Sequence, residues 1–505
     1  MKKGIVSVGI LGSVLLLAAG CGNGNADTTV AKSKAANAGG SSKKEISLML
    51  PLHTPAPPTG DIGERIEDYT GLKMKIDWYP DASRDERIQS GLASGTLSDV
   101  VFMGGATVRQ ALSSGMFWDV EDYLKDFPNL SQIPDDRIES AKIEGHLYGI
   151  PSVNDVARYG VVVRKDWLDN LNLEVPHTID DLTEVARAFT EDDPDGNGKD
   201  DTVGFVDRVE SFEYCFPTLA GYFGAGSKFY KQDDDTIIPS FMQDEFKEAM
   251  KWYRGIYENG WMNSDFVVMP KQQQEEYISQ GNAGIMVTGL SGPRNFMRNA
   301  EGTDEEGMQW ALINDMTYKD VPRRIISDTN NGFGGWYAIP KDYVKTEDEL
   351  KVVLGFLDDM AGEEMSFLLS QGVEGVHYKV NDKGEIEPIN ADKKAQEVSP
   401  YNPLNINSIR YKGKTKSSDP LTEEINEKTT ENEKYAVLDP TLPLDSDTYD
   451  KEWGVLIEPI KDAYFKYILG DEEMGDFDKA IDKFLSQGGQ DVIDEFTESY
   501  KKSNK

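Results

Sequence analysis

A short acidic loop that begins at Asp193 places oxygen-bearing side chains at alternate positions of the chain. Asp193, Asp195 and Asn197 are side-chain donors of this kind, and the glycines among them let the backbone curl. A loop of this pattern wraps several hard oxygen ligands around Ca²⁺. The spacing therefore predicts a calcium site that Lys199 completes through its backbone carbonyl and Asp201 through its carboxylate.

The loop departs from the full EF-hand pattern, which closes with a glutamate, because the corresponding position here is Gly204. The site would then be closed early by Asp201 or helped by a carboxylate from elsewhere. The alternative is a solvated acidic turn between a helix and a strand, since Asp, Asn and Gly are common turn residues. The tight alternation with glycine favours calcium.

The amino-terminal residues have the pattern of a secretory signal, in which Met1-Lys2-Lys3 precedes an apolar run over residues 4–19. The run ends in a sequence similar to a bacterial lipobox, with Ala18 at a position where Leu is commoner. Cys21 would then carry fatty acids such as palmitate. A transmembrane helix is the alternative, but the run is shorter than the ~20 apolar residues that span a bilayer. We expect a signal peptide over residues 1–20 and a disordered tether over 21–44, rich in Gly, Ser, Ala and Lys.

The composition restricts the class of partner. The formal net charge is −36, and acidic residues are spread along the chain. Nucleic acids and anionic lipid surfaces bind clustered Lys and Arg, so neither is expected as a partner. Cys215 is the only cysteine besides Cys21, so we expect no intrachain disulfide in the mature protein. Stability must come from a large core, and the length of the body predicts two or more domains.

Alternating strand and helix patterns after residue 44 predict an α/β fold. Apolar strand-like runs at residues 45–52, 72–78 and 100–103 are separated by helical patterns, which is typical of a parallel sheet. Ligands of such sheets bind beyond the carboxyl ends of the strands. His53 and Gly105 follow two of these strands and are therefore candidate ligand residues.

Several strings in the chain, taken together, resemble the extracellular solute-binding proteins of family 1, and within them the LipO/LplA-like lipoproteins that serve carbohydrate ABC importers. These strings follow the lipobox in the same order as in the family. They are Leu50–Thr54, Gly91–Val101, Tyr148–Pro151, Arg164–Leu168, the Asp193 loop, Phe356–Asp358, Glu374–Tyr378 and Gly488–Ile493. In relatives that bind acidic oligosaccharides such as alginate, a similar loop holds calcium. One further carboxylate ligand of those relatives falls at Thr202 of this chain.

The resemblance implies a two-lobed periplasmic-binding-protein-like α/β fold, with hinge strands between the lobes and ligand bound between them. We expect lobe 1 to contain residues 45–155 and 286–335, and lobe 2 residues 156–285 and 336–505. The chain would cross between the lobes near residues 154–158, 284–288 and 336–340. Calcium would then lie in lobe 2, away from the ligand, and its role would be structural.

A sugar presents flat apolar faces ringed by hydroxyl groups, so its binding site needs aromatic platforms and polar side chains. The aromatic candidates near predicted strand ends or hinges are Tyr159, Tyr214, Phe216, Tyr222, Phe223, Trp336, Tyr337 and Tyr378. The polar candidates are His53, Asn154, Asp155, Arg158, Arg294 and His377. Placement at a hinge or a helix start favours Trp336, Asp155 and Arg294, and Arg158 or Arg294 could pair with the carboxylate of an acidic sugar.

The family resemblance implies a monomeric, lipid-anchored binding protein on the outer face of the cell membrane, which delivers a carbohydrate to ABC permease subunits. Two alternatives stay open, a carbohydrate-active enzyme and a sugar sensor that does not take part in transport. A glycosidase needs two carboxylates that face each other across the site. No Asp or Glu lies in a recognisable catalytic string, and there is no Gly-x-Ser-x-Gly motif, so we expect no enzymatic activity.

Overall fold

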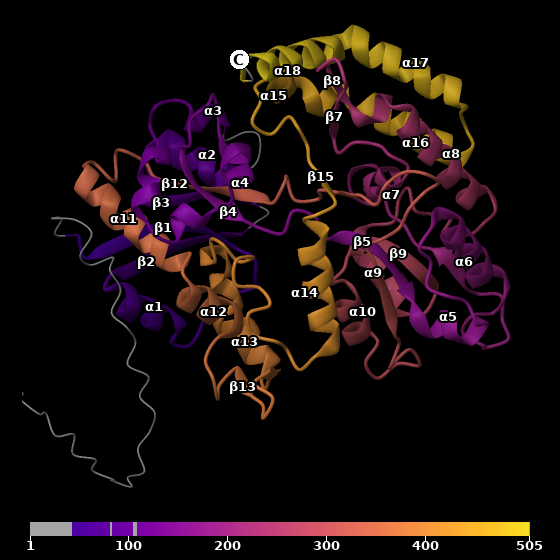
Figure 1. Cartoon of the computed structure of the whole chain (residues 1–505), viewed down its shortest axis with the longest axis horizontal. Coiled ribbons are helices and arrows are strands. Elements are labelled where there is room, and N and C mark those ends of the chain that lie inside the picture. Colours follow the sequence, from indigo (N-terminus) through magenta and orange to yellow (C-terminus); the bar gives the residue numbers. More distant parts are fainter. Residues whose placement is uncertain (1–42, 81–82, 105–108, 504–505) are drawn as a thin grey trace, which may run out of the picture. The chain divides into compact units, whose positions relative to one another are not determined.

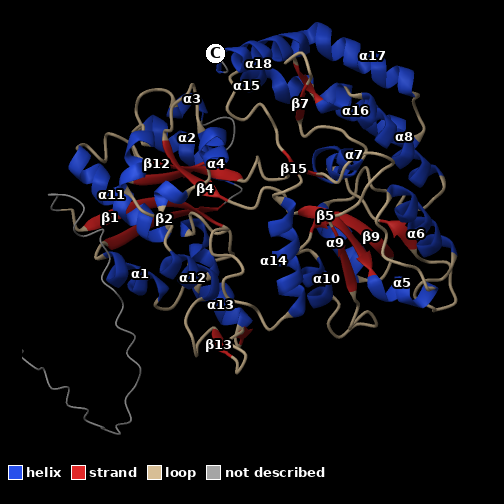
Figure 2. Cartoon of the chain, in the orientation of Figure 1, coloured by secondary structure: helices blue, strands red, loops and turns tan. Residues whose placement is uncertain are grey.

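The computed structural model describes residues 43–80, 83–104 and 109–503 (Figure 1). The predicted signal peptide and most of the tether, with the lipidation residue Cys21, lie outside the described residues, and so does Gly105. Within the described ranges, none of the helices combines the length and apolar content that crossing a bilayer requires. The described part is an α/β body with two main sheets and helices packed around them (Figure 2).

Five strands form the first sheet, in the spatial order β2 (Lys73–Pro80), β1 (Glu45–Leu52), β3 (Val100–Met103), β12 (Phe333–Ala338) and β4 (Gly149–Val153). β1 is parallel to β2 and β3, and β12 is antiparallel to β3 and β4. The predicted parallel arrangement of the first three strands is confirmed. At one edge of this sheet, the carboxyl ends of β1 to β4 therefore meet the amino end of β12.

Four strands form the second sheet, in the order β10 (Trp310–Ile313), β5 (Tyr159–Arg164), β9 (Ala283–Gly289) and β6 (Val203–Phe205). β5 is antiparallel to both neighbours, and β6 is parallel to β9. The carboxyl ends of β6, β9 and β10 therefore meet at one edge with the amino end of β5. Val161, Val162 and Val163 are all fully buried, as expected for a strand that is covered on both faces.

Each sheet has its own hydrophobic core. The core of the first sheet draws on residues between Ile46 and Val153 and between Phe333 and Ile406. The helices of this part are α1 (Ile62–Thr70), α2 (Arg84–Ser94), α3 (Arg109–Leu112), α4 (Asp135–Ala141), α11 (Glu347–Met360), α12 (Glu363–Gln371) and α13 (Ala391–Glu397), with the hairpin β13 (Tyr378–Val380) and β14 (Ile386–Pro388).

The core of the second sheet draws on residues between Val161 and Met316 and between Leu444 and Phe496. A smaller cluster covers the other face of this sheet. The helices are α5 (Lys165–Leu171), α6 (Ile179–Glu191), α7 (Phe216–Tyr222), α8 (Asp244–Glu258), α9 (Lys271–Ser279), α10 (Pro293–Asn299), α14 (Pro420–Asn432), α15 (Asp447–Leu456), α16 (Glu458–Leu469), α17 (Met474–Phe484) and α18 (Gln490–Ser503), with the hairpin β7 (Phe229–Lys231) and β8 (Ile237–Pro239).

The helix α6 begins at a capping box formed by Thr178 and Asp181. The Thr178 hydroxyl accepts a hydrogen bond from the Asp181 N–H at 3.1 Å, and the Asp181 carboxylate accepts one from the Thr178 N–H at 3.1 Å. Two amide groups that a helix start leaves without partners are thereby satisfied. The box fixes the start of the helix that leads into the Asp193 loop.

The structure corrects the predicted division into lobes. Within residues 286–335, β10 completes the second sheet and not the first, because it pairs with β5 through Trp310 and Arg164. After residue 336, α11 and α12 pack into the core of the first sheet. The glycine-rich strand β12 also belongs to the first sheet. The sheet partners of β10 and β12 lie far away in the sequence, so local patterns could not assign these strands to a lobe.

In the residues that the structure describes, the chain passes between the two sheets through three segments: residues 154–158, 314–332 and 407–443. The first was predicted. The predicted crossings at 284–288 and 336–340 are wrong, because those residues lie mainly within β9 and β12, which pair inside their sheets. Two of the crossing segments pair with each other through the short parallel strands β11 (Ile325–Ile326) and β15 (Ala436–Val437).

Candidate functional site

The first crossing presents a row of backbone carbonyl groups that accept hydrogen bonds from the other two crossings. The Thr329 hydroxyl lies 2.7 Å from the carbonyl oxygens of both Asp155 and Val156. From the third crossing, the Asn432 side-chain amide donates to the Ala157 carbonyl at 2.9 Å. All three segments that join the sheets are therefore bonded together, which makes them one hinge.

Two predicted ligand residues in the hinge already have ionic partners. The Asp155 carboxylate accepts hydrogen bonds from the Lys412 ammonium, at 2.8 Å from both oxygens. Arg158 pairs with Asp328 at 3.2 Å. Burial raises the pKa of Asp328, while the Arg158 charge and hydrogen bonds oppose this rise. Asn154 lies in the same segment and is partly exposed. Lys412 and Asp328 were not predicted, since neither lies in a recognisable motif.

Seven of the predicted ligand residues are buried. Their exposed fractions range from 0% to 8%: Phe216, Tyr222, Phe223, Trp336, Tyr337, His377 and Tyr378. The Trp336 indole donates to the Ala141 carbonyl at 2.7 Å and contacts the Phe333 ring, with centroids 4.5 Å apart. We therefore correct the expectation that Trp336 contacts the ligand, because a ring enclosed by the core has no face left for a sugar.

Tyr214 and Tyr159 remain accessible, and both lie at the edge where the strands of the second sheet end. Tyr214 is 48% exposed, on a single π-helical turn, Ser211–Cys215, that follows β6. The guanidinium carbon of Arg208 lies 5.6 Å from the centroid of the Tyr214 ring, within range of a cation–π interaction. Burial raises the pKa of Tyr159, and the positive charge of Arg208 opposes the rise. A buried arginine thus interacts with both tyrosines.

Arg208 was missed by the sequence analysis, although it lies three residues after the end of β6. Its guanidinium is held by Glu210 at 2.8 Å and Gln274 at 3.0 Å. The preceding residue, Asp207, is 2% exposed and accepts hydrogen bonds from Ser211 and Tyr253, both at 2.5 Å. These bonds fix the turn that presents Tyr214.

The remaining predicted contacts, His53 and Arg294, are exposed. His53 directly follows β1, and Arg294 lies in α10, which follows β9. The strand ends of both sheets therefore carry His53, Asn154, Tyr159, Tyr214 and Arg294. By the rule for α/β sheets, this is the candidate ligand edge.

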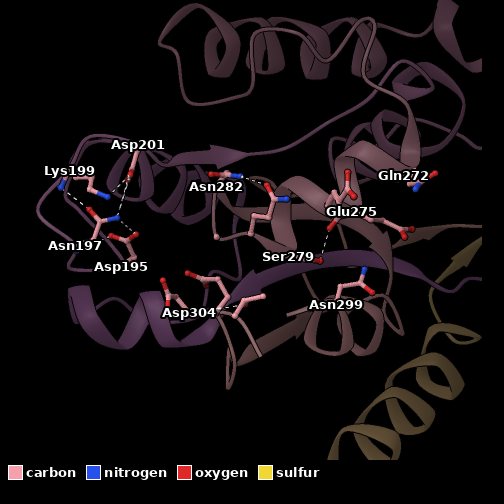
Figure 3. Close-up of a pocket in the computed structure, with 15 residues that line it drawn as sticks. Asp195, Asn197, Lys199, Asp201, Gln272, Glu275, Ser279, Asn282, Asn299 and Asp304 are labelled. Carbon is pink, nitrogen blue, oxygen red and sulfur yellow. Dashed lines mark hydrogen bonds and ion pairs between the residues drawn. The ribbon is translucent and has the colours of Figure 1, made fainter. Parts of the chain in front are cut away.

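The Asp193 loop has the conformation of a curled, oxygen-rich turn (Figure 3). Asp193 has φ 48°, and Gly196 and Gly198 have φ 71° and 75°, the left-handed region that glycine adopts without strain. The Asp193 carboxylate accepts from the Gly198 N–H at 3.0 Å. The Asn197 amide nitrogen donates to Asp195 at 2.7 Å and to Asp201 at 3.2 Å. This amide group lies between two carboxylates.

The electrostatics of the loop favour a positive charge. Burial is the largest cause that raises the pKa of Asp195, and the negative charges of Asp201 and Asp193 add to it. A cation among these carboxylates would relieve their repulsion. Across the part of the chain that the structure describes, however, no three His, Cys, Asp or Glu side chains are arranged to hold a metal. The oxygen donors of the loop fit calcium by type and spacing, and the Asn197 amide would have to turn its oxygen inward.

Thr202, the position of a further carboxylate ligand in similar calcium loops, has another role here. It is 6% exposed, and its hydroxyl donates to the Phe189 carbonyl near the end of α6 at 2.8 Å. The Thr190 hydroxyl in turn accepts from the Gly204 N–H at 2.9 Å. These bonds attach β6 to α6 without any contribution from a metal ion.

A pocket of about 910 Å³ lies beside the Asp193 loop and is lined by acidic groups that include Asp195, Asp201, Glu275 and Asp304 (Figure 3). Its lining includes none of the predicted sugar contacts. The pocket residues precede β6, β9 and β10, so they lie at the edge of the sheet opposite to the strand carboxyl ends. For this reason we place the candidate ligand site at the other edge, despite the size of this pocket.

Residues 58–364 match the family model described as "Bacterial extracellular solute-binding protein". The chain belongs to this family, and its two-lobed α/β architecture agrees with the membership.

Three similar proteins extend the match over nearly the whole chain. The polygalacturonan/rhamnogalacturonan-binding protein YtcQ of Bacillus subtilis (strain 168) is 38% identical over 99% of this chain and 98% of its own length. Lipoprotein LipO of the same organism is 32% identical over 93% of this chain and 95% of its own. Among solved structures, the alginate-binding protein AlgQ2 without calcium ion covers 91% of this chain and 99% of its own, with a TM-score of 0.65 and 20% identity.

Proposed function

We propose that this protein binds a carbohydrate, an oligosaccharide, and delivers it to the permease subunits of an ABC importer. The near full-length similarity to YtcQ, whose name describes polysaccharide binding, carries the proposal. The hinge supports it, because three bonded crossings allow two lobes to move about one axis and close on a ligand. The proposal contains no chemical step, so it includes no catalytic residues.

The ligand site is proposed to lie at the strand-end edges, with Tyr214 as an aromatic platform and Tyr159, Asn154 and His53 near it. Tyr214 is suited to stack on a sugar ring because half of its surface is open while Arg208 and the π-helical turn hold it in place. Arg208 itself is 2% exposed and acts as a positioning residue.

We further propose that the protein is a monomer held at the outer face of the cell membrane through acyl chains, palmitate among them, on Cys21. The name of the relative LipO and the lipobox-like sequence before Cys21 support this anchor. Globomycin-sensitive processing and metabolic labelling with palmitate would test it. A Cys21→Ser variant that still incorporates labelled palmitate would contradict the assignment.

Calcium is proposed as a structural ion at the Asp193 loop. Asp193, Asp195, Asn197, Asp201 and the carbonyl of Lys199 would hold it, and the similar solved structures that support this include AlgQ2 without calcium ion and an EF-hand mutant of FusA. When bound, the ion would supply a positive charge that neutralises the crowded carboxylates. In this proposal the loop acts on the stability of its lobe and not on the sugar.

Calorimetry with a panel of neutral and acidic oligosaccharides tests the binding function. We expect one-to-one binding, a more compact protein by small-angle X-ray scattering, and an unchanged ligand by chromatography. Tyr214→Ala should weaken binding roughly tenfold, the order of an aromatic contact. Tyr230→Ala, in the β7 hairpin, is the matched control and should bind normally.

Turnover of any oligosaccharide would favour the enzyme alternative, and failure to bind the whole panel would refute the proposal. Deletion of the gene separates the transporter from a sensor. The transporter predicts that uptake of the bound sugar is lost, whereas a sensor would leave uptake by the cell intact.

A further inference from the structure

Two cations, Arg294 and Lys394, have no carboxylate partner within the described part of the chain. The formal charge of the chain is −36, with 89 acidic and 53 basic residues. Nevertheless, among the described residues no Asp or Glu forms an ion pair with either side chain. Arg294 donates to the Thr422 hydroxyl, and the Lys394 ammonium donates to the Gln371 side-chain oxygen at 3.4 Å. A positive side chain without a carboxylate partner is available to bind an anion.

The neighbours of these residues show the contrast. Lys393, next to Lys394 in α13, pairs with Glu397 at 3.7 Å. In the hinge, Arg158 and Lys412 both have aspartate partners. Thr422, the hydrogen-bond partner of Arg294, in turn donates to the Asp419 carboxylate through its hydroxyl and its N–H. Thr422 thus stands between Arg294 and Asp419.

The two cations act on each other. The pKa of Lys394 is lowered by burial first and then by the positive charge of Arg294. Burial and the Arg294 charge both disfavour the charged form of the Lys394 ammonium. An anion bound between the two side chains would offset the repulsion between their positive charges. The pair is therefore a position where one negative charge stabilises two positive ones.

The placement of the pair agrees with ligand binding. Arg294 belongs to α10, which follows β9 of the second sheet. Lys394 belongs to α13, and its partner Gln371 ends α12, which packs on the first sheet. Thr422 lies in α14, within the third crossing (Figure 1). The cluster thus combines groups from both lobes and the hinge, as a ligand that closes the lobes would require.

We propose that Arg294 and Lys394 together bind a carboxylate of the ligand, so that the oligosaccharide is acidic and contains uronate residues. The proposal rests on the proposed function. The planar guanidinium of Arg294 can bind a carboxylate through two parallel hydrogen bonds, while Lys394 adds a point charge. Gln371 and Thr422 remain beside them as polar partners for sugar hydroxyl groups.

The test compares three ligand sets by calorimetry: oligogalacturonates, the same oligomers as neutral methyl esters, and sulfated oligosaccharides. We expect the full-length protein to bind the free acid and to lose at least about tenfold in affinity for the ester, a typical effect of removing one partner from a charge pair. Arg294→Gln and Lys394→Gln should each weaken binding of the free acid by a similar factor and leave binding of the ester almost unchanged.

Arg298→Gln, on the same helix, and Lys393→Gln, next to Lys394, are the matched controls. Each removes one positive charge, and both should bind the free acid like the wild type. Equal losses in the controls and the test variants would overturn the proposal, because net charge alone would then explain the effect. Preference for sulfated over uronate ligands would overturn the assignment to a carboxylate.

The outcomes also separate this proposal from the proposed function. Tight binding of a neutral oligosaccharide without binding of any acidic one would refute the anionic site but leave the sugar importer intact. If neither neutral nor acidic oligosaccharides bind, the proposed function fails and the anionic site fails with it.

Discussion

Asp439 is a buried acid in the third crossing, where it is 8% exposed. Its carboxylate accepts from the Thr441 N–H at 2.9 Å and hydroxyl at 2.7 Å, and its backbone is bonded to Asn331 of the second crossing. Burial raises the pKa of Asp439 above its usual value, although the Thr441 bonds oppose this. The ionised form of Asp439 therefore destabilises the folded protein.

Asp439→Asn should stabilise the protein at neutral pH. A raised pKa in the folded state means that the stability contributed by Asp439 is fully present below its unfolded pKa and is lost as the pH rises through the folded value. Asn keeps an acceptor for Thr441 and does not ionise, so it avoids this loss. We expect a gain on the order of 1 kcal/mol at pH 7 that vanishes at acidic pH.

Thermal melts from pH 3 to pH 8 would measure this difference. Asp382→Asn, at the exposed tip of the β13 hairpin, is the control and should follow the wild type at every pH. A variant whose stability relative to the wild type does not change with pH would show that Asp439 does not titrate in this window.

The Asp193 loop connects α6 to β6, two elements that are already attached by the Thr202 and Thr190 hydroxyl groups. The helix and strand can therefore form without an ion, and the loop between them holds the crowded carboxylates. This arrangement favours a structural role for calcium within one lobe, because the loop precedes β6 whereas the candidate ligand edge lies after the end of β6.

Calcium should raise the melting temperature of the protein in the absence of sugar. A stabilisation of about 2.7 kcal/mol follows when free calcium is a hundred times its dissociation constant. Asp195→Asn should abolish most of this rise, whereas Asp200→Asn, at an adjacent position outside the proposed ligand set, should preserve it. If a chelator weakens sugar binding while the melting temperature stays constant, the ion acts on the ligand site instead.

Across the whole molecule, the hinge is the feature on which binding depends. The carbonyl groups of residues 155–157 accept hydrogen bonds from two other segments, so the three crossings cannot move independently without breaking these bonds. Ser327 adds a further bond to the Val156 carbonyl at 2.7 Å. Closure of the lobes would therefore be a concerted bending of all three segments.

Thr329→Val should destabilise the protein and change its affinity for sugar together. Valine has nearly the same shape but cannot donate to the Asp155 and Val156 carbonyl groups, so a loss of about 1–3 kcal/mol is expected. Thr430→Val, which removes a hydroxyl that bonds within the exposed turn of α14, is the control. Melting temperatures and calorimetry check both effects. If the Thr329→Val variant has the melting temperature and the sugar affinity of the wild type, the Thr329 hydrogen bonds do not stabilise the hinge.

Local patterns were sufficient for much of the fold. The strands at 45–52 and 100–103, and the helical patterns between the first strands, agree with the structure because alternation and helical spacing depend on neighbouring residues. The order of the short sequence motifs along the chain also indicated the solute-binding protein family. The lipid anchor and the calcium loop remain predictions that rest on sequence pattern.

Tertiary structure decided what neighbouring residues cannot encode. It placed β10 in the second sheet and the whole of β12 in the first, buried Trp336 and Tyr337 in a core, and paired Asp155 and Arg158 with Lys412 and Asp328. It left Arg294 and Lys394 without carboxylate partners among the described residues. Sheet pairing, burial and charge compensation depend on residues distant in the chain, and only folding brings those residues together.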